Sequence, residues 1–267
     1  MNLTSIEKNK QTKKAIDRQA IVQRELDWHE HEAYRRIPLD QLLYDPPAFD
    51  AVVQSGIDYL QPQPGERVLE MGCGEGKEVL ALARLGLSVI GTDLSHTQLM
   101  RARELIDKAH PPGKAYLVQA SAEQLPFAAN AFGSIYGKAI LHHLDLDIAA
   151  LETRRLLNVV GRATFAEPLA HHPIFWLARR LTPRLHTRDE RPFPLSAFQR
   201  FAAPFAQWHI EAVFLLAPFA YPIRRMRGGE KLFRRIHRGL QRIDHWLLKH
   251  IPPLRRLAWY GIVKVQK

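Results

Sequence analysis

The chain has 267 residues, 46% of them hydrophobic and 24% charged, and its formal net charge is +11. This length suits one α/β domain with additions, and the composition is that of an ordinary globular protein. The single cysteine excludes an intrachain disulfide, and no apolar run is long enough to span a bilayer. Because residues 1–14 also lack the apolar core of a signal peptide, we expect a cytoplasmic protein.

The N-terminal residues are predicted to stand apart from the main domain. Residues 1–14 are polar and predicted to be disordered, and residues 15–34 have the pattern of an amphipathic helix. Prolines then interrupt the chain before a helix predicted at 51–60. We therefore assign residues 1–50 to a tail and helical lid, and residues 51–267 to the main domain.

A glycine-rich loop follows the first predicted strand, which covers residues 67–71. Glu70 precedes Gly72, Gly74 and Gly76, and apolar residues then recur at helical spacing. The glycines allow a sharp turn without a Cβ atom between backbone and ligand, and the helix start offers free N–H groups. Glu70 and Glu75 would repel the pyrophosphate of a dinucleotide, so the loop favours a ligand with a positively charged end.

This loop resembles the first motif of class I S-adenosylmethionine-dependent methyltransferases, of the small-molecule type called methyltransferase type 11. The resemblance implies S-adenosylmethionine as the cofactor and an α/β, doubly wound, mostly parallel seven-stranded sheet. It also implies an N-terminal helical lid, with helical insertions after strand five and between the last two strands. The cofactor contacts implied in the loop are Glu70, Gly72, Cys73, Gly74 and Gly76, with Cys73 interpreted as a small residue rather than a reactive thiol.

The next two predicted strands also end in polar residues. Asp93 ends the strand at 87–93, where this fold places a carboxylate that binds ribose hydroxyls, with Leu94 beside it; capping of the helix predicted at 95–109 is the alternative. The strand at 115–120 leads to Ser121 and Ala122. In the resembling family an acid at the position of Ser121 binds the adenine amino group, and the backbone of the following residue contacts the adenine ring. Ser121 replaces that acid, and Glu123 either compensates or is an exposed loop residue.

The fourth and fifth strands are predicted at 130–137 and 162–167, separated by a helix at 147–158 and a turn at Gly161. Because strands and helices alternate, the sheet should be parallel and covered on both faces, with ligands beyond the strand C-termini. Five polar residues occupy these ends: Glu70, Asp93, Ser121, Lys138 and Glu167.

The remaining chain is predicted to add two insertions to the sheet. Residues 168–206 leave the end of the fifth strand and should form a substrate cap over the ligand. Strands at 207–216 and 258–265 should form an antiparallel hairpin at the sheet edge, separated by the basic helical insertion at 218–257.

Methyl transfer requires placement of the acceptor near the methyl carbon, and a base only where the acceptor carries a proton that it cannot lose alone. The candidate catalytic residues are four histidines that follow the fourth and fifth strands, His142, His143, His171 and His172. His171 and His172, between prolines in the predicted cap, are favoured. Glu167 could orient a substrate or an imidazole, and a purely structural role remains open for His142. No metal site is expected.

The basic insertion has two possible interpretations. Between Pro222 and Leu257 there are eleven basic and two acidic residues, so this segment contributes +9 of the +11. Apolar residues at helical spacing form one predicted stripe, Leu232, Ile236, Leu240, Ile243 and Leu247, and the basic residues lie off it. The stripe either packs on the protein, or lies on an anionic membrane surface with Trp246, Ile251 and Leu254 in the interface.

These features predict methyl transfer from S-adenosylmethionine to a small-molecule or lipid-like acceptor. An RNA methyltransferase that uses the basic segment is the first alternative, and a non-catalytic S-adenosylmethionine-binding module is an alternative of another class. A peripheral position at the inner membrane surface is the alternative to a purely cytoplasmic one.

Overall fold

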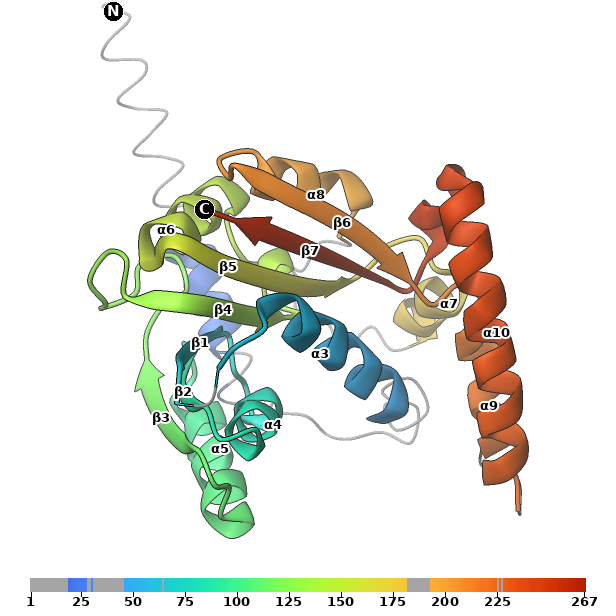
Figure 1. Cartoon of the computed structure of the whole chain (residues 1–267), viewed down its shortest axis with the longest axis horizontal. Coiled ribbons are helices and arrows are strands. Elements are labelled where there is room, and N and C mark those ends of the chain that lie inside the picture. Colours follow the sequence, from blue (N-terminus) through green and yellow to red (C-terminus); the bar gives the residue numbers. More distant parts are fainter. Residues whose placement is uncertain are drawn as a thin grey trace, which may run out of the picture.

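The computed structural model of the chain describes residues 19–27, 30, 46–63, 65–181, 193–224, 226 and 228–267. They build one seven-stranded sheet with the strand order β3-β2-β1-β4-β5-β7-β6 (Figure 1). β1 to β5 are parallel, and β7 is antiparallel to both β5 and β6. The strands are β1 Arg67–Met71, β2 Ser88–Asp93, β3 Lys114–Gln119, β4 Phe132–Lys138, β5 Leu157–Pro168, β6 Gln207–Val213 and β7 Tyr260–Gln266. This confirms the predicted mostly parallel sheet with its antiparallel edge hairpin.

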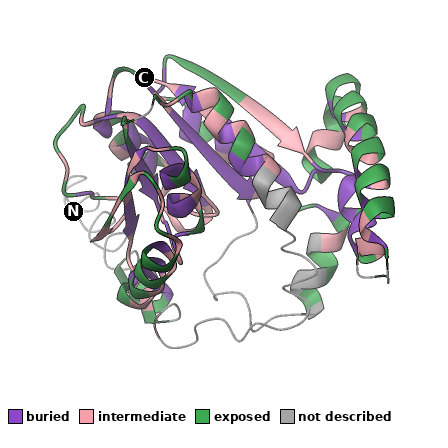
Figure 2. Ribbon diagram, turned by 60° about the horizontal axis from the view of Figure 1, so that its bottom comes forward, coloured by how far each residue is buried: buried purple, intermediate pink, exposed green. Residues whose placement is uncertain are grey.

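Side chains alternate between the two faces of the sheet along each strand, so apolar side chains stand on both faces. Helices cover both faces and bury them. On one face, α3 (Pro46–Leu60), α4 (Lys77–Arg84) and α5 (His96–Ala109) bury a cluster that includes Val68 and Val89. On the other face, α6 (Leu146–Leu156) and α8 (Leu195–Ala202) pack on the side chains of alternate strand residues. Figure 2 shows the resulting arrangement, in which the buried central strands lie between helices with exposed outer surfaces.

A second group of helices lies in the connections that follow β4, β5 and β6. It consists of η1 Leu141–His143, α7 Pro173–Leu181, η3 Ala217–Ala220, α9 Tyr221–Arg224, α10 Glu230–His250 and η4 Pro252–Leu257. The long helix α10 stands at one side of the molecule, next to α9 and near α7 (Figure 1). Phe233 of α10, Ile174 of α7 and Trp259 before β7 belong to one apolar cluster, so these elements form a continuous body with the sheet.

Two boundaries differ from the sequence prediction. α3 begins at Pro46 rather than near residue 51, because proline is compatible with the first turn of a helix, where its missing N–H has no partner to lose. The predicted domain boundary at residue 50 therefore falls inside this helix. The predicted turn at Gly161 is wrong, because Gly161 lies within β5, which begins directly after α6.

The predicted substrate cap at 168–206 is wrong in its second half. α8 packs between α6 and the sheet, and its Phe198 and Phe201 are fully buried in the core. The apolar spacing of this segment is that of a core helix. Residues 182–192, in the first half, lie outside the described residues, as do Tyr34, Arg36 and Tyr44 of the predicted lid.

The apolar stripe predicted for α10 is divided between two surfaces. The helix docks through Phe233, His237, Asp244 and Leu248, which are all buried. Leu232 and Ile243 of the predicted stripe remain about half exposed. Leu254, predicted to enter a membrane interface, instead packs against the core. In the part of the chain that the structure describes, no helix combines the length and apolar character needed to cross a membrane.

Candidate cofactor site and catalytic edge

The glycine loop connects β1 to α4, and its three glycines have different roles. All three adopt positive φ values, 71° at Gly72, 49° at Gly74 and 77° at Gly76. A Cβ atom on Gly72 would lie 2.6 Å from Ile140 Cδ1, and one on Gly76 would lie 2.7 Å from Ala102 Cβ, so these two glycines allow close packing. A Cβ atom on Gly74 would meet no atom of the described residues within 4 Å. Gly74 therefore borders open space, where a ligand has direct access to the backbone.

Glu70 places a buried carboxylate directly before this loop. It is 1% exposed, and its Oε2 atom has no hydrogen-bond partner among the described residues. Burial, followed by the nearby Glu78 carboxylate, holds the pKa of Glu70 well above its usual value. Lys138 opposes this effect, but its ammonium group already forms an ion pair with Glu78. This buried acid suits a cation and disfavours a phosphate.

The tyrosine beside Glu70 was not anticipated from the sequence. Tyr136 of β4 is the register neighbour of Glu70, and its hydroxyl is buried without a hydrogen-bond partner within the described part of the chain. Burial raises the pKa of Tyr136, and Glu78 and Glu70 raise it further. The site therefore contains two buried polar atoms, Glu70 Oε2 and Tyr136 Oη, that could each interact with a bound ligand.

Asp93, at the end of β2, holds the glycine loop in place. Its Oδ2 atom accepts a hydrogen bond from the Gly74 N–H at 2.8 Å, and its Oδ1 atom accepts one from the Ser95 N–H at 2.9 Å. The cap of α5 is Ser95, whose Oγ atom accepts from the Gln98 N–H at 3.1 Å, so the alternative role of Asp93 as that cap is wrong. Each carboxylate oxygen can accept a further bond, and a ribose contact from Asp93 stays a prediction. Leu94 follows it and is half-buried.

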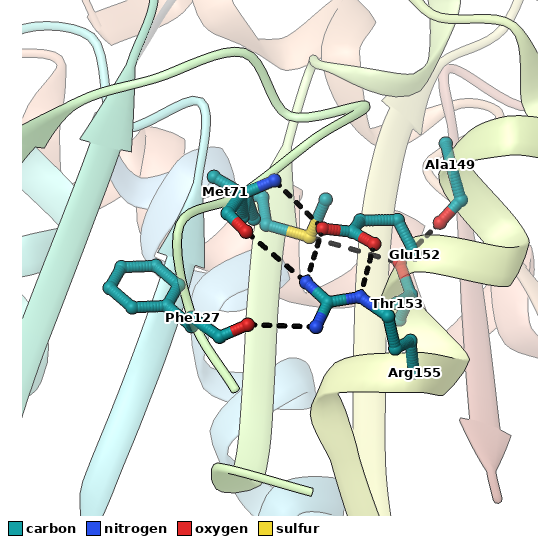
Figure 3. Close-up of polar contacts among 7 residues, drawn as sticks. Met71, Phe127, Ala149, Glu152, Thr153 and Arg155 are labelled. Carbon is teal, nitrogen blue, oxygen red and sulfur yellow. Dashed lines mark hydrogen bonds and ion pairs between the residues drawn. The ribbon is translucent and has the colours of Figure 1, made fainter. Parts of the chain in front are cut away.

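The loop after β3, which carries Ser121 and Ala122, is fixed from α6 (Figure 3). Arg155 donates to the carbonyl groups of Phe127 at 2.7 Å and Leu125 at 3.2 Å, and it forms an ion pair with Glu152. Ala122 is buried and Ser121 half-buried. The loop is thus held in one shape beside the glycine loop.

Glu123 in this loop has a structural partner. Its Oε1 atom accepts from the Asp145 N–H at 2.6 Å, so the interpretation of Glu123 as an exposed loop acid is wrong. Glu123 connects the loop to the start of α6. Adenine recognition by Ser121 and Ala122 stays a prediction.

The end of β4 joins the glycine loop to a histidine–carboxylate pair. Glu167 is fully buried, and its Oε1 atom accepts from the backbone N–H groups of Ile140 and Leu141 at 2.8 and 2.7 Å. Its Oε2 atom lies 2.6 Å from His142 Nδ1. The expectation that Glu167 orients an imidazole is confirmed for His142. Ile140 also lies against Gly72, so the backbone that binds Glu167 is in contact with the glycine loop.

His143 connects the same edge to the N-terminal segment. Its Nδ1 atom lies 3.0 Å from Glu25 Oε2, and its ring centroid is 4.0 Å from that of His142. Farther along this segment, Glu30 accepts from Ser95 Oγ at 2.8 Å and from the Thr97 side chain. These bonds lower the pKa of Glu30 to about 2. Through Glu25 and Glu30 this segment thus contacts the regions that follow β4 and β2, and the predicted lid stays a prediction.

The two favoured histidines lie apart from this edge. His172 is fully buried, stacks on Trp259 with ring centroids 5.6 Å apart, and its Nε2 atom is 3.1 Å from the Leu215 carbonyl oxygen. Burial lowers the pKa of His172, which favours the neutral form of this packed residue. His171 is exposed. The structure brings His142 and His143 together with Glu167, and it does not bring His171 and His172 to them.

Several residues of this site could not be found from local sequence patterns. Glu78 and Tyr136 approach Glu70 only through the packing of α4 and β4, and Glu25 approaches His143 from a distant segment. Glu75, which we counted as a second repelling acid, is paired with Arg101 at 3.2 Å. Of the two acids, Glu70 is therefore the one that disfavours a pyrophosphate at this loop.

These residues fit S-adenosylmethionine. Glu70 offers a buried acid that suits an ammonium group, Gly74 leaves backbone open to a ligand, and Asp93 lies at the end of the neighbouring strand. The fold and the site together have the features of a class I S-adenosylmethionine-dependent methyltransferase domain, and the site residues suit S-adenosylmethionine as its cofactor.

The comparisons with known proteins agree with this class. Residues 69–165 match the family model described as a methyltransferase domain. The O-methyltransferase cnsE of Penicillium expansum is 31% identical over 116 residues, which are 43% of this chain and 42% of that protein. A malonyl-[acyl-carrier protein] O-methyltransferase of Legionella pneumophila is 33% identical over 112 residues, 41% of this chain and 38% of that protein. The matches thus span less than half the length of these two relatives.

Among solved structures, a geranyl diphosphate C-methyltransferase of Streptomyces coelicolor superposes with a TM-score of 0.54 and 18% identity. The superposition covers 81% of this chain and 75% of that one. That structure contains Mg²⁺, geranyl-S-thiolodiphosphate and S-adenosyl-L-homocysteine. At this identity the likeness supports the fold alone.

Proposed function

We propose that this protein transfers a methyl group from S-adenosylmethionine to a small-molecule or lipid-like acceptor. The observation that carries the proposal is the position of the Glu167–His142 pair directly beside the glycine loop, at the carboxyl edge of the sheet. The bound cofactor would supply an electrophilic methyl group on a sulfonium. The protein's contribution is then to hold the acceptor in line and to accept its proton where one must leave.

The residues that would hold the cofactor divide by the part of the molecule that they contact. Glu70 accepts hydrogen bonds from the ammonium group, and Asp93 from the ribose hydroxyls. The backbone around Gly74 lies against the ligand. Ser121 and Ala122 border the adenine. Gly72, Cys73, Gly76, Leu94 and Lys138 complete the proposed set, with Lys138 acting through its backbone because its side chain is paired with Glu78.

His142 is the proposed general base. Glu167 holds its Nδ1 atom, which fixes the ring orientation and stabilises the imidazolium that forms on proton uptake. His143 lies beside it and is a second candidate. His172 is not retained, because its buried ring is engaged with Leu215 and Trp259, and His171 serves as the comparison residue.

The acceptor class is inferred from the names of similar proteins. Of the similar proteins described above, one acts on malonyl-[acyl-carrier protein] and one on geranyl diphosphate, which are small or lipid-like acceptors. An RNA acceptor and a non-catalytic binding role are the competing proposals. Transfer of tritium from labelled S-adenosylmethionine into lipid, metabolite and RNA extracts distinguishes the three, with the Gly74→Val variant as the inactive control. Label in the lipid or metabolite fraction is expected, label only in RNA supports the first alternative, and no transfer despite cofactor binding supports the second.

The His142 proposal has its own test. Once an acceptor is identified, His142→Ala should lower the rate by about 10² to 10⁴ if the acceptor must lose a proton. Affinity for S-adenosylhomocysteine should stay the same, and His171→Ala should keep full activity. Full activity in the His142 and His143 variants would leave a mechanism that works by positioning alone.

A further inference from the structure

Helix α10 presents three different surfaces, each formed by residues spaced three or four apart or by multiples of that spacing. Because an α-helix has 3.6 residues per turn, such spacing aligns side chains along one side. One side docks the helix onto the protein, the second is apolar and exposed, and the third is basic and exposed. Figure 2 shows the outward side of this helix as largely exposed.

The docked surface fixes α10 rigidly. It consists of Phe233, His237, Leu240, Asp244 and Leu248. Asp244 is 3% exposed and accepts hydrogen bonds from three successive backbone N–H groups, those of residues 215–217, at 2.7 to 3.0 Å. The orientation of the other two surfaces therefore follows from contacts in the core, and the exposed side chains are not needed to hold the helix.

The second surface, which we name the apolar ridge, consists of Leu232, Gly239, Ile243 and Trp246. Leu232 is 51% exposed, Ile243 48% and Trp246 56%. Three large apolar side chains aligned on one helix are more than the scattered exposure that soluble surfaces normally show. Removal of this ridge from water by a partner would be favourable.

The third surface, which we name the basic ridge, adjoins the apolar ridge along the helix. Its members, all exposed, are Lys231, Arg235, Arg238, Arg242 and Lys249. Between Pro222 and Leu257 the net charge is eleven minus two, or +9. An apolar ridge flanked by a basic one is the arrangement of helices that lie in the plane of a membrane interface.

We propose that α10 binds this protein to the surface of a bilayer that contains anionic lipids, with the apolar ridge at the headgroup boundary and the basic ridge over the lipid phosphates. A second copy of the chain fits less well, because two segments of +9 repel each other. RNA would pair with the basic ridge but would leave Leu232, Ile243 and Trp246 in water. The bilayer is the partner that satisfies both ridges.

The position of α10 gives this contact a consequence for the reaction. Phe233 of α10 packs in the same cluster as Tyr260, and Tyr260 pairs with Pro168 at the carboxyl end of β5. The arrow of β5 accordingly points toward α7 and α10 in Figure 1. If the proposed function holds, an acceptor dissolved in the bilayer would reach the catalytic edge from the bound membrane. Membrane binding itself does not depend on that function.

The test is co-sedimentation of the full chain with phosphatidylcholine vesicles, with and without phosphatidylglycerol, at low and high salt. Three double variants are compared with the wild type. Arg235→Glu with Arg242→Glu alters the basic ridge, and Ile243→Ser with Trp246→Ser alters the apolar one. Arg103→Glu with Leu151→Ser is the matched control, since these side chains are exposed on α5 and α6, away from α10.

The wild type and the control should bind phosphatidylglycerol vesicles in a salt-sensitive manner and leave pure phosphatidylcholine vesicles unbound. Because each basic residue near an anionic surface strengthens binding by about fivefold, the basic-ridge variant should bind at least about tenfold more weakly. The apolar-ridge variant should also lose binding. Retained affinity for S-adenosylhomocysteine in every variant would show that the fold and the cofactor site are intact, which separates failure of this proposal from failure of the proposed function.

Three results would overturn the proposal. The first is equal vesicle binding by all variants, and the second is absence of binding to either kind of vesicle. The third is release of the wild type from anionic vesicles by competing RNA together with full RNA binding by the apolar-ridge variant.

Discussion

The three glycines in the loop after β1 serve two different functions, and Gly74 differs from the other two. Gly72 and Gly76 are close to Ile140 and Ala102, so a side chain there would break the packing of the loop. Gly74 has the same left-handed backbone but borders open space. The sequence spacing identified all three positions, whereas only the structure distinguishes which of them a ligand approaches.

Gly74→Val should therefore abolish cofactor binding, and calorimetry with S-adenosylhomocysteine measures it. Valine at a positive φ also strains the backbone, by about 1–3 kcal/mol, so a control is needed. Gly65→Val provides it, because Gly65 has a φ of 81° and also borders open space, but lies in the turn before β1. Gly65→Val should lose as much stability as Gly74→Val but should keep the wild-type affinity for S-adenosylhomocysteine. Unchanged affinity in Gly74→Val would contradict the assignment of the site.

Glu70 should make the stability of the unliganded protein depend on pH. Its pKa is raised in the folded state, so the native protein binds a proton that the unfolded chain has already released. Stability should therefore fall as the pH rises from the usual carboxyl value of about 4.3 through the raised pKa. Thermal unfolding of Glu70→Gln between pH 5 and pH 8 should show a flatter profile and a higher midpoint at pH 8. Glu75→Gln is the control, and an identical profile for wild type and Glu70→Gln would exclude the buried acid as the cause.

At the scale of elements, the strands were largely predictable because apolar runs ended in polar residues at regular separations. Six of the seven predicted strands lie within a few residues of the observed ones, and the fifth begins five residues earlier than predicted. That error arose at Gly161, which is interpreted as a turn but lies within β5, where a Cβ atom would be 3.0 Å from Leu157 Cδ2 and 3.1 Å from the Asn158 nitrogen. The glycine lies in an irregular part of the strand, where the register with β4 shifts between Phe132 and Ser134.

Helical faces were predicted less well, because an apolar spacing shows that a helix buries one side but not what it packs against. α8 is expected in a cap, because its segment follows the carboxyl end of β5, and is instead a core helix between α6 and β7. In α10 the docked side includes His237 and Asp244, which no hydrophobic pattern would select. Long-range hydrogen bonds decided this orientation, and sequence spacing contains no information about them.

Asp244→Ala should consequently destabilise the protein strongly. It would remove the acceptor for three backbone N–H groups, and each buried donor left without a partner costs about 1–3 kcal/mol. A loss of at least about 2 kcal/mol in the free energy of unfolding is expected from urea denaturation. Asp107→Ala, at an exposed position of α5, should change it by less than about 0.5 kcal/mol. A small effect of Asp244→Ala would mean that water or a rearranged loop replaces the carboxylate.

At the scale of the whole molecule, the sheet gathers residues far apart in the chain at one edge. Glu70, Asp93, Ser121, Lys138 and Glu167 were predicted there from topology alone, since parallel strands end on the same side. The N-terminal contacts of Glu25 and Glu30 could not be predicted, because nothing in their neighbourhood in the sequence specifies a partner more than 60 residues away. The residues at the strand ends are thus predictable from local sequence, and the N-terminal contacts with this edge are not.

The central claim is that this edge binds S-adenosylmethionine rather than a dinucleotide. Calorimetric titration of the wild type with S-adenosylhomocysteine and, separately, with nicotinamide adenine dinucleotide tests it most directly. We predict saturable binding of S-adenosylhomocysteine, no binding of the dinucleotide, and a loss of about 1.5–3 kcal/mol of binding free energy in Asp93→Ala. Binding of the dinucleotide without S-adenosylhomocysteine, or affinity for S-adenosylhomocysteine that is unchanged in Asp93→Ala, would contradict the account.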